Sequence, residues 1–285
     1  MNGSFPLYFT IWHKLGVYAI RLAAAAVLTF LILPIVVVIP LSFNSEPFFS
    51  FTKGMLAFQA EAYSLRWYAG ILEDPNWILA IKNSLIIGFF ATVLATALGT
   101  VAALGMSSPA MPLKRTITAV LISPMIVPLI IIAAGMFFFY SRLGLVATYP
   151  GVIIAHAALG VPFVMITVTA TLAGFDRSLY NAALGLGAGP ARAFKDVVLP
   201  LIRPGVISGA LFAFVTSFDE VVLILFLAGP DQRTIPRQMF AGLREQINPT
   251  ILAVATLLVI VSICLLVTLE LLRRRSERLR GEVPA

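Results

Sequence analysis

The stretch NAALGLGAGPARAFKDVVLPLIRPG (residues 181–205) interrupts a very apolar chain with glycine, proline and charged residues. It is preceded by DRSLY, and residues 176–189 have the composition of a short helix followed by a close turn, because Gly187 and Gly189 permit backbone angles that other residues avoid. Pro190 suits the first turn of a second helix. Pro200 is expected to end that helix, and Pro204 to open the next one. The pattern predicts a helix-turn-helix too short and too charged to cross a bilayer.

The rest of the chain has the composition of a membrane protein. Of its 285 residues 60% are hydrophobic and 12% are charged, with a mean hydropathy of +0.98, whereas soluble domains carry about 25% charged residues. The single cysteine, Cys264, lies in an apolar run, which excludes a disulfide framework and a cysteine metal site. The formal charge of +7 does not indicate nucleic acid, because the arginines of the last residues are typical of a membrane-flanking anchor.

Six apolar runs are long enough to span a bilayer, which takes about 20 residues per helix. They predict an all-α membrane protein with six transmembrane helices. The first run is longer than the apolar part of a secretory signal and is followed by no convincing cleavage site, so we interpret it as a true span. The runs cover residues 17–42, 83–106, 116–140, 150–174, 205–228 and 250–272.

Orientation follows from the distribution of lysine and arginine, which are in excess on the cytoplasmic side of membrane proteins. With the amino terminus inside, thirteen of the twenty fall on the cytoplasmic side, so both termini and residues 181–205 are expected there. The thirteen are Lys14, Arg21, Lys114, Arg115, Arg177, Arg192, Lys195, Arg203 and the tail residues Arg273, Arg274, Arg275, Arg278 and Arg280.

Two outer segments have open interpretations. Residues 43–82 are expected to hold either an amphipathic helix at the interface or an aromatic belt with no role in transport. The loop before the last span either receives a binding protein or is an ordinary solvated loop. The residues concerned are Leu65, Trp67, Tyr68, Ile71 and Leu72 in the first segment, and Arg233, Arg237, Arg244 and Glu245 in the second.

Prolines interrupt two of the predicted spans. The third contains Ser123, Pro124 and Pro128 in ISPMIVPL, and the fourth contains Pro162. Proline removes a helical hydrogen bond that lipid cannot replace, so such helices are tolerated beside other helices or a water-filled cavity. Pro124 and Pro128 are therefore candidate gating residues, with a purely structural kink as the alternative.

The interrupting stretch resembles the EAA loop of ABC importer permeases, roughly E-A-A-x3-G-A-x5-F-x2-I-x-L-P-x3-P. The resemblance implies a MetI-like type I importer transmembrane domain, in which this loop couples an ATPase to the membrane helices. Asn181 stands where the family usually has glutamate; asparagine can still accept a hydrogen bond or cap the helix. The implied coupling residues are Asn181, Ala182, Ala183, Gly187, Ala188, Phe194, Leu199 and Pro200, and Val197 and Pro204 also fit the pattern.

The resemblance extends over most of the chain. Asn83-Ser84-Leu85 and residues 217–230 and 234–257 are most similar to the second permease of the spermidine/putrescine branch. This implies a second homologous permease, two ATP-binding subunits that hold ATP and magnesium, and a periplasmic substrate-binding protein, in a bacterial inner membrane. It also implies an amino-terminal helix and outer segment (1–82), a core permease domain (83–272) with the coupling loop at 176–204, and a basic tail (273–285).

The substrate path is predicted from acidic residues inside the fifth span. Asp219 and Glu220 lie deep in an apolar run, where a carboxylate must face the bundle interior, a cation or water. If both are helical they point about 100° apart, so Asp219 is the candidate for the path, Glu220 for an interhelical or gating contact, and Phe218 for a cation–π contact. An acid paired with an arginine of this chain or of the partner permease is the alternative.

An enzyme is not expected. The sequence has no GxxxxGK[ST] phosphate loop and no HExxH site, and His156 is expected to be buried and bonded to a helix. The chain is expected to bind no cofactor and no metal. The function is predicted as polyamine import; the alternatives are a permease for an opine, iron or thiamine-type solute, or a secondary transporter or channel.

Overall fold

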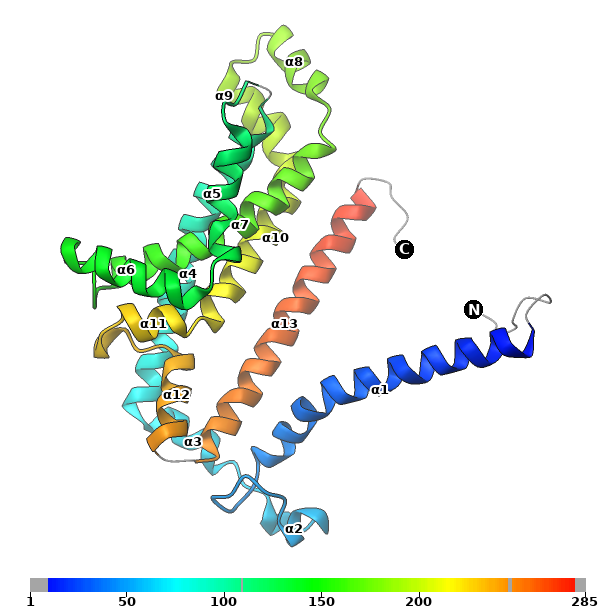
Figure 1. The fold of residues 1–285 in the computed structure, drawn as a ribbon, viewed down its shortest axis with the longest axis vertical. Helices are drawn as coiled ribbons and strands as arrows, with labels where there is room; N and C mark the ends of the chain where they lie inside the picture. Colours follow the sequence, from blue (N-terminus) through cyan, green and yellow to red (C-terminus); the bar gives the residue numbers. More distant parts are fainter. Residues whose placement is uncertain (1–9, 109, 246–247, 280–285) are drawn as a thin grey trace. The chain divides into compact units, whose positions relative to one another are not determined.

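The computed structural model describes residues 10–108, 110–245 and 248–279, and Figure 1 shows them as helices joined by short connections. The chain divides into two units. The first contains Met1–Ile71 and Ile247–Ile260, and the second contains Leu72–Gln246 and Val261–Ala285. The side chains of Arg244 and Glu245, and those of the basic tail from residue 272 onward, lie outside the described residues.

The first unit begins with α1 (Ile11–Leu41), which is capped by Thr10, whose side chain accepts the His13 N–H. The helix starts six residues before the predicted span and includes Lys14 and Arg21, and it is apolar enough to cross a membrane.

A small folded segment follows α1 in the same unit. It contains α2 (Lys53–Leu56), η1 (Ala60–Ala62) and α3 (Arg66–Glu73). The buried Asn44 organises it: its side-chain amide donates to Phe48 O and Ser50 O, and its backbone carbonyl accepts the Trp67 Nε1–H at 2.7 Å. The helix predicted around Trp67 is confirmed, with Ile71 buried.

The second unit is built on α4 (Pro75–Ser107), α7 (Tyr149–Ala173) and α10 (Leu199–Asp219). The helix α4 begins eight residues before the predicted span, because Asp74 caps it and Pro75 occupies its first position. The remaining elements are α5 (Lys114–Ile126), α6 (Leu129–Leu143), α8 (Arg177–Gly185), α9 (Pro190–Ala193), η2 (Phe194–Val198), α11 (Val222–Leu227), η3 (Pro230–Gln232) and α12 (Ile235–Glu245).

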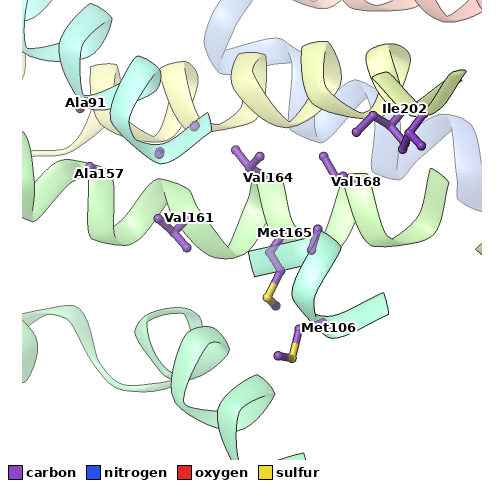
Figure 2. Packing of buried hydrophobic residues seen from close by; sticks show 12 residues of the cluster. Ala91, Met106, Ala157, Val161, Val164, Met165, Val168 and Ile202 are labelled. Carbon is purple, nitrogen blue, oxygen red and sulfur yellow. The ribbon is translucent and has the colours of Figure 1, made fainter. Parts of the chain in front are cut away.

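Small residues let α4, α7 and α10 approach one another closely. A Cβ built on Gly160 of α7 would lie 2.9 Å from the Cβ atoms of both Ala95 and Ala213, and one on Gly209 of α10 would lie 2.7 Å from Val164 Cα. Figure 2 shows the buried cluster at this contact, which includes Val164, Met165, Val168 and Ile202. In a bilayer such packing replaces the hydrophobic driving force between helices.

Two of the predicted spans are broken. Residues 116–140 form α5 and α6, which meet at an angle of 105° at Val127–Pro128. The run 205–228 ends as a helix at Asp219 and resumes as α11 at Val222. The kink predicted from the prolines of the third run is confirmed by this bend. The break in the fifth run was not predicted, because an average of apolarity does not detect a change in chain direction.

The last helix, α13 (Thr250–Leu279), begins in the first unit and continues in the second. Five helices of the described chain are long and apolar enough to cross a membrane, and the bent pair α5–α6 makes a sixth candidate. The fourth predicted span coincides with α7 to within one residue.

Candidate coupling hairpin and substrate path

The helix α8 forms the first arm of a hairpin between α7 and α10. Asp176 caps it, accepting the Ser178 N–H at 2.8 Å and the Ser178 hydroxyl at 2.6 Å. These two hydrogen bonds hold the pKa of the exposed Asp176 carboxyl below its ordinary value, the hydroxyl making the larger contribution. The capping role considered for Asn181 is therefore filled by Asp176, and Asn181 lies mid-helix, exposed.

The carboxyl end of α8 is a Schellman motif. The Ala188 N–H donates to Ala183 O and the Gly187 N–H to Leu184 O, each at 3.0 Å. Gly187 has a φ of +87°, which is why glycine is required at this position. The close turn predicted at Gly187 is confirmed. Gly189, by contrast, has an ordinary negative φ of −67° and precedes α9.

The tip of the hairpin offers a shaped surface. Leu186 is 89% exposed at the turn. A cavity of about 350 Å³ opens beside it, lined by Leu186, Ala188, Val197 and the exposed ion pair Arg192–Asp196. An exposed apolar side chain next to a cavity that carries a positive and a negative side chain is a surface to which a soluble protein can bind.

The second arm of the hairpin does not end at Pro200 as predicted. The short α9 passes into η2, a π-helical turn at Phe194–Val198, and then directly into α10, so that one helix runs over Pro190–Asp219. A wider turn just before Pro200 removes the clash that its ring makes with the carbonyl four residues earlier. Pro204 lies inside α10 and does not open a new span.

The hairpin is anchored to the bundle through both arms. On the second arm and its continuation Ala193, Val198 and Ile202 are buried, and Phe194 of the second arm and Tyr180 of the first pack partly buried against the cluster that holds Val198 and Ile202. Of the residues predicted to couple to an ATPase, Asn181, Ala182, Ala183, Gly187 and Ala188 lie on the first arm and the turn, and Phe194, Leu199 and Pro200 on the continuous helix.

The acids predicted for the substrate path lie at the end of α10 in two different environments. Asp219 is the last residue of the helix and is exposed, without a hydrogen bond or ion pair to the residues that the structure describes. Glu220 is extended and buried, and its carboxylate accepts the N–H groups of Val222 at 2.5 Å and Leu223 at 3.0 Å. The premise of two helical acids 100° apart was wrong, since Glu220 lies outside both helices and its carboxylate caps the first N–H groups of α11. Phe218 is half-buried and stacks on Phe214 with ring centroids 5.4 Å apart.

The candidate gating prolines lie at the bend between α5 and α6. Pro124 cannot donate to Val120 O, and the Ser123 hydroxyl donates to that carbonyl instead at 2.8 Å. Pro128 is the residue that precedes α6. The helix that follows this bend, α6, packs against the helix that follows the break at Glu220, α11. Ala133 of α6 and Leu223 of α11 belong to one buried cluster, to which α7 also contributes.

A buried polar site that sequence reasoning did not resolve lies at Asn83. Its side-chain amide donates to Asp231 O and Arg233 O at 2.8 Å each, and its side-chain carbonyl accepts the Tyr149 hydroxyl at 2.7 Å. The neighbouring Ser84 Oγ accepts the Ile235 N–H at 2.9 Å. The signal was present in Asn83-Ser84-Leu85, a polar pair within an apolar run, and the structure shows that the pair fixes the loop before α12.

His156 lies within the bundle as predicted. It is buried, and its Nδ1 lies 2.9 Å from Ser217 Oγ of α10.

Beyond the membrane helices, Arg237 donates to Ala228 O and Gly229 O. Burial lowers the pKa of Arg237, and the nearby charge of Arg233 lowers it further. Arg237 therefore holds the loop together.

The sequence over residues 95–278 matches the family described as the binding-protein-dependent transport system inner membrane component. The chain belongs to this family. As such a component it is a multi-pass inner membrane permease of an ABC importer, a transport subunit and not an enzyme. The resemblance carried by the EAA loop is thereby confirmed.

Curated relatives of this inner membrane component include polyamine permeases. It is 28% identical over 250 residues to the spermidine/putrescine transport system permease protein PotC of Haemophilus influenzae, covering 88% of this chain and 94% of the relative. It is 32% identical over 241 residues to the putrescine transport system permease protein PotI of Escherichia coli strain K12, covering 81% of this chain and 82% of the relative.

Solved structures share the fold. A bacterial ABC transporter involved in the import of the acidic polysaccharide alginate superimposes with a TM-score of 0.71 at 14% identity, covering 95% of this chain and 99% of the other. The all-α, MetI-like architecture predicted from the sequence is therefore confirmed.

Proposed function

We propose that this permease moves polyamine-like cations, of the putrescine and spermidine type, into the cytoplasm by ATP-driven alternating access. The observation that carries the proposal is the similarity to PotI and PotC over more than four fifths of the chain. The exposed carboxylate of Asp219 supports it, because ammonium groups that leave water need fixed countercharges.

The assembly we propose has four kinds of component. A second homologous permease completes the pathway, two ATP-binding subunits hold ATP and magnesium, and a periplasmic protein delivers the solute. Both termini and the hairpin at residues 176–204 are on the cytoplasmic side, with residues 1–82, 83–272 and 273–285 as the amino-terminal part, the core and the basic tail. The exposed Leu186 and the charged hollow beside it support docking of an ATP-binding subunit at the hairpin.

Transmission from the hairpin follows from the continuity of α10. The helix from Pro190 to Asp219 has 30 residues, which gives a rod about 45 Å long at 1.5 Å per residue. One end of the rod belongs to the hairpin and the other carries Asp219. A displacement at the hairpin is therefore delivered to the break at Glu220 and, through α11, to α6 beyond the candidate gate at Pro124 and Pro128.

The test is ATP hydrolysis by the complete complex in lipid discs, with binding protein loaded with putrescine or spermidine. Stimulation by a polyamine is expected, and Asp219→Asn is expected to weaken it at least tenfold. The matched control is Asp231→Asn, which removes an exposed carboxylate from η3. Equal activity of Asp219→Asn and the unchanged complex would remove Asp219 from the path.

A second candidate is a permease for another small organic solute. It is favoured by the 30% identity over 160 residues to the trehalose transport system permease protein SugB of Mycobacterium tuberculosis, which covers 56% of this chain. Stimulation only by an uncharged or anionic solute would establish this alternative and leave the family assignment intact.

A further inference from the structure

A second and larger cavity is lined in part by the hairpin. Figure 1 shows α8 and α9, which belong to the hairpin, at one end of the bundle. The cavity has a volume of about 820 Å³ and lies between the carboxyl ends of α4 and α7, the first residue of α5, and the hairpin. Since these are the ends of apolar helices, the cavity is at the level where a membrane meets water.

The lining of the cavity combines apolar and basic side chains. Met106, Leu172 and Phe175 are among its apolar side chains, and Lys114 and Arg177 are its charged residues. None of the described carboxylates lines it. The nearest acid in sequence, Asp176, is engaged by Ser178.

Both cations are available to a ligand. Lys114 is exposed and forms no ion pair with the described residues. Arg177 donates from Nη2 to Ser107 O, the carbonyl at the end of α4. A guanidinium has five N–H donors, so this single bond both fixes the side chain and leaves donors for an anion. The helix α5 starts at Lys114 with no side-chain cap, which adds partial positive charge at the same place.

We propose that this cavity binds the headgroup of an anionic phospholipid, with the phosphate held by Lys114 and Arg177 and an acyl chain against the apolar side chains of the lining. Basic pockets between transmembrane helices at the membrane surface bind such headgroups. A water-soluble anion would pair with the two cations but would leave the apolar side chains of the lining uncovered. A phospholipid would both pair with the cations and cover the apolar side chains.

The site also touches the coupling helix, because Asn181 and Tyr180 of α8 line the same cavity. A bound lipid therefore contacts the arm of the hairpin directly. If the hairpin is the coupling element, as in the proposed function, membrane composition acts on coupling through this contact; the binding site itself does not depend on that function.

The experiment is native mass spectrometry of the delipidated full-length chain in detergent, titrated with phosphatidylglycerol or with phosphatidylcholine of the same acyl chains. The test variant is Lys114→Gln/Arg177→Gln. The matched control, Arg115→Gln/Arg203→Gln, removes two exposed cations that do not line the cavity. Because Arg177 is bonded to α4, Lys114→Glu is included as a variant that breaks no bond within the described structure.

Phosphatidylglycerol is expected to bind roughly 30-fold more weakly to Lys114→Gln/Arg177→Gln, since each cation near an anionic headgroup contributes about fivefold. Lys114→Glu is expected to lose at least fivefold, and the control pair less than threefold. If the control pair lost as much affinity for phosphatidylglycerol as the test pair, the loss would be explained by net charge alone, and the proposed site would be overturned. Equal binding of the two lipids, or displacement by inorganic phosphate at the same concentration, would overturn the assignment to an anionic lipid.

Discussion

Asn83→Asp tests the polar site that fixes the loop before α12. The substitution preserves shape but replaces an amide nitrogen, which donates to Asp231 O and Arg233 O at 2.8 Å, with an oxygen. Asp231 O keeps the Tyr149 hydroxyl at 3.0 Å, whereas the carbonyl of Arg233 loses the side-chain donor that it has among the described residues.

The magnitude follows from these contacts. Two lost hydrogen bonds cost about 1 kcal/mol each, and a buried carbonyl left without a partner costs about 1–3 kcal/mol. Because Asn83 has no exposed surface, a carboxylate there cannot recover its hydration. The free energy of unfolding is expected to fall by about 3–5 kcal/mol.

The measurement is unfolding of the purified chain by SDS titration in mixed micelles. Asn181→Asp is the matched control, because Asn181 is exposed on α8 and its side chain has no hydrogen bond to the described residues, and surface changes are usually within about 0.5 kcal/mol. Tyr149→Phe, which removes one partner of Asn83, is expected to cost about 1–2 kcal/mol. An Asn83→Asp curve that coincides with that of Asn181→Asp would refute the argument.

Three further substitutions test the hairpin, the helix contact and the break. Gly187→Val places a β-branched residue at a φ of +87° and is expected to abolish uptake in cells while the chain stays in the membrane fraction; Gly185→Ala is expected to retain uptake, and equal uptake by both would contradict the role of the turn. Gly209→Ala is expected to lower the free energy of unfolding by about 1–3 kcal/mol through overpacking against α7, whereas Gly135→Ala, in open space on α6, is expected to be neutral or stabilising in the same SDS titration. Glu220→Ala is expected to cost about 1–2 kcal/mol by removing the acceptor for the first N–H groups of α11, and Glu220→Gln, which keeps an acceptor oxygen, clearly less; equal losses in the two variants would show that the negative charge, and not the acceptor oxygen, is what Glu220 supplies.

The hairpin was largely predictable because its signals are local. Asp176, Gly187 and Pro190 each fix a cap, a turn or a first helical position through their own backbone preferences. The prediction that the second helix of the hairpin ends at Pro200 was wrong, and the reason is also local. Proline stops a helix only if the preceding turn cannot widen, and here the preceding turn, η2, is a wider π-helical turn.

The arrangement of the candidate site was less predictable, since it depends on contacts between distant segments. Apolarity located the spans, but the bend at Val127–Pro128 and the break at Glu220 leave the average apolarity unchanged. Asn83 meets Asp231 and Arg233 across about 150 positions of the chain. The apolar periodicity of α4 can indicate whether Asn83 is buried. Its hydrogen-bond partners, however, can be identified only from the tertiary structure.

Pro124, just before the bend between α5 and α6, and the break at Glu220 each have a polar group beside them that replaces a lost backbone partner. The Ser123 hydroxyl bonds to the carbonyl that Pro124 cannot reach, and the Glu220 carboxylate accepts the first N–H groups of α11. Lipid offers no such partners, so the chain must supply them. A polar residue next to a break in an apolar run is therefore to be interpreted first as a backbone partner. By this criterion the Glu220 carboxylate is already engaged by the backbone, whereas Asp219 has no hydrogen-bond or ion-pair partner among the described residues. Asp219 is therefore the carboxylate that we propose for contact with a cation.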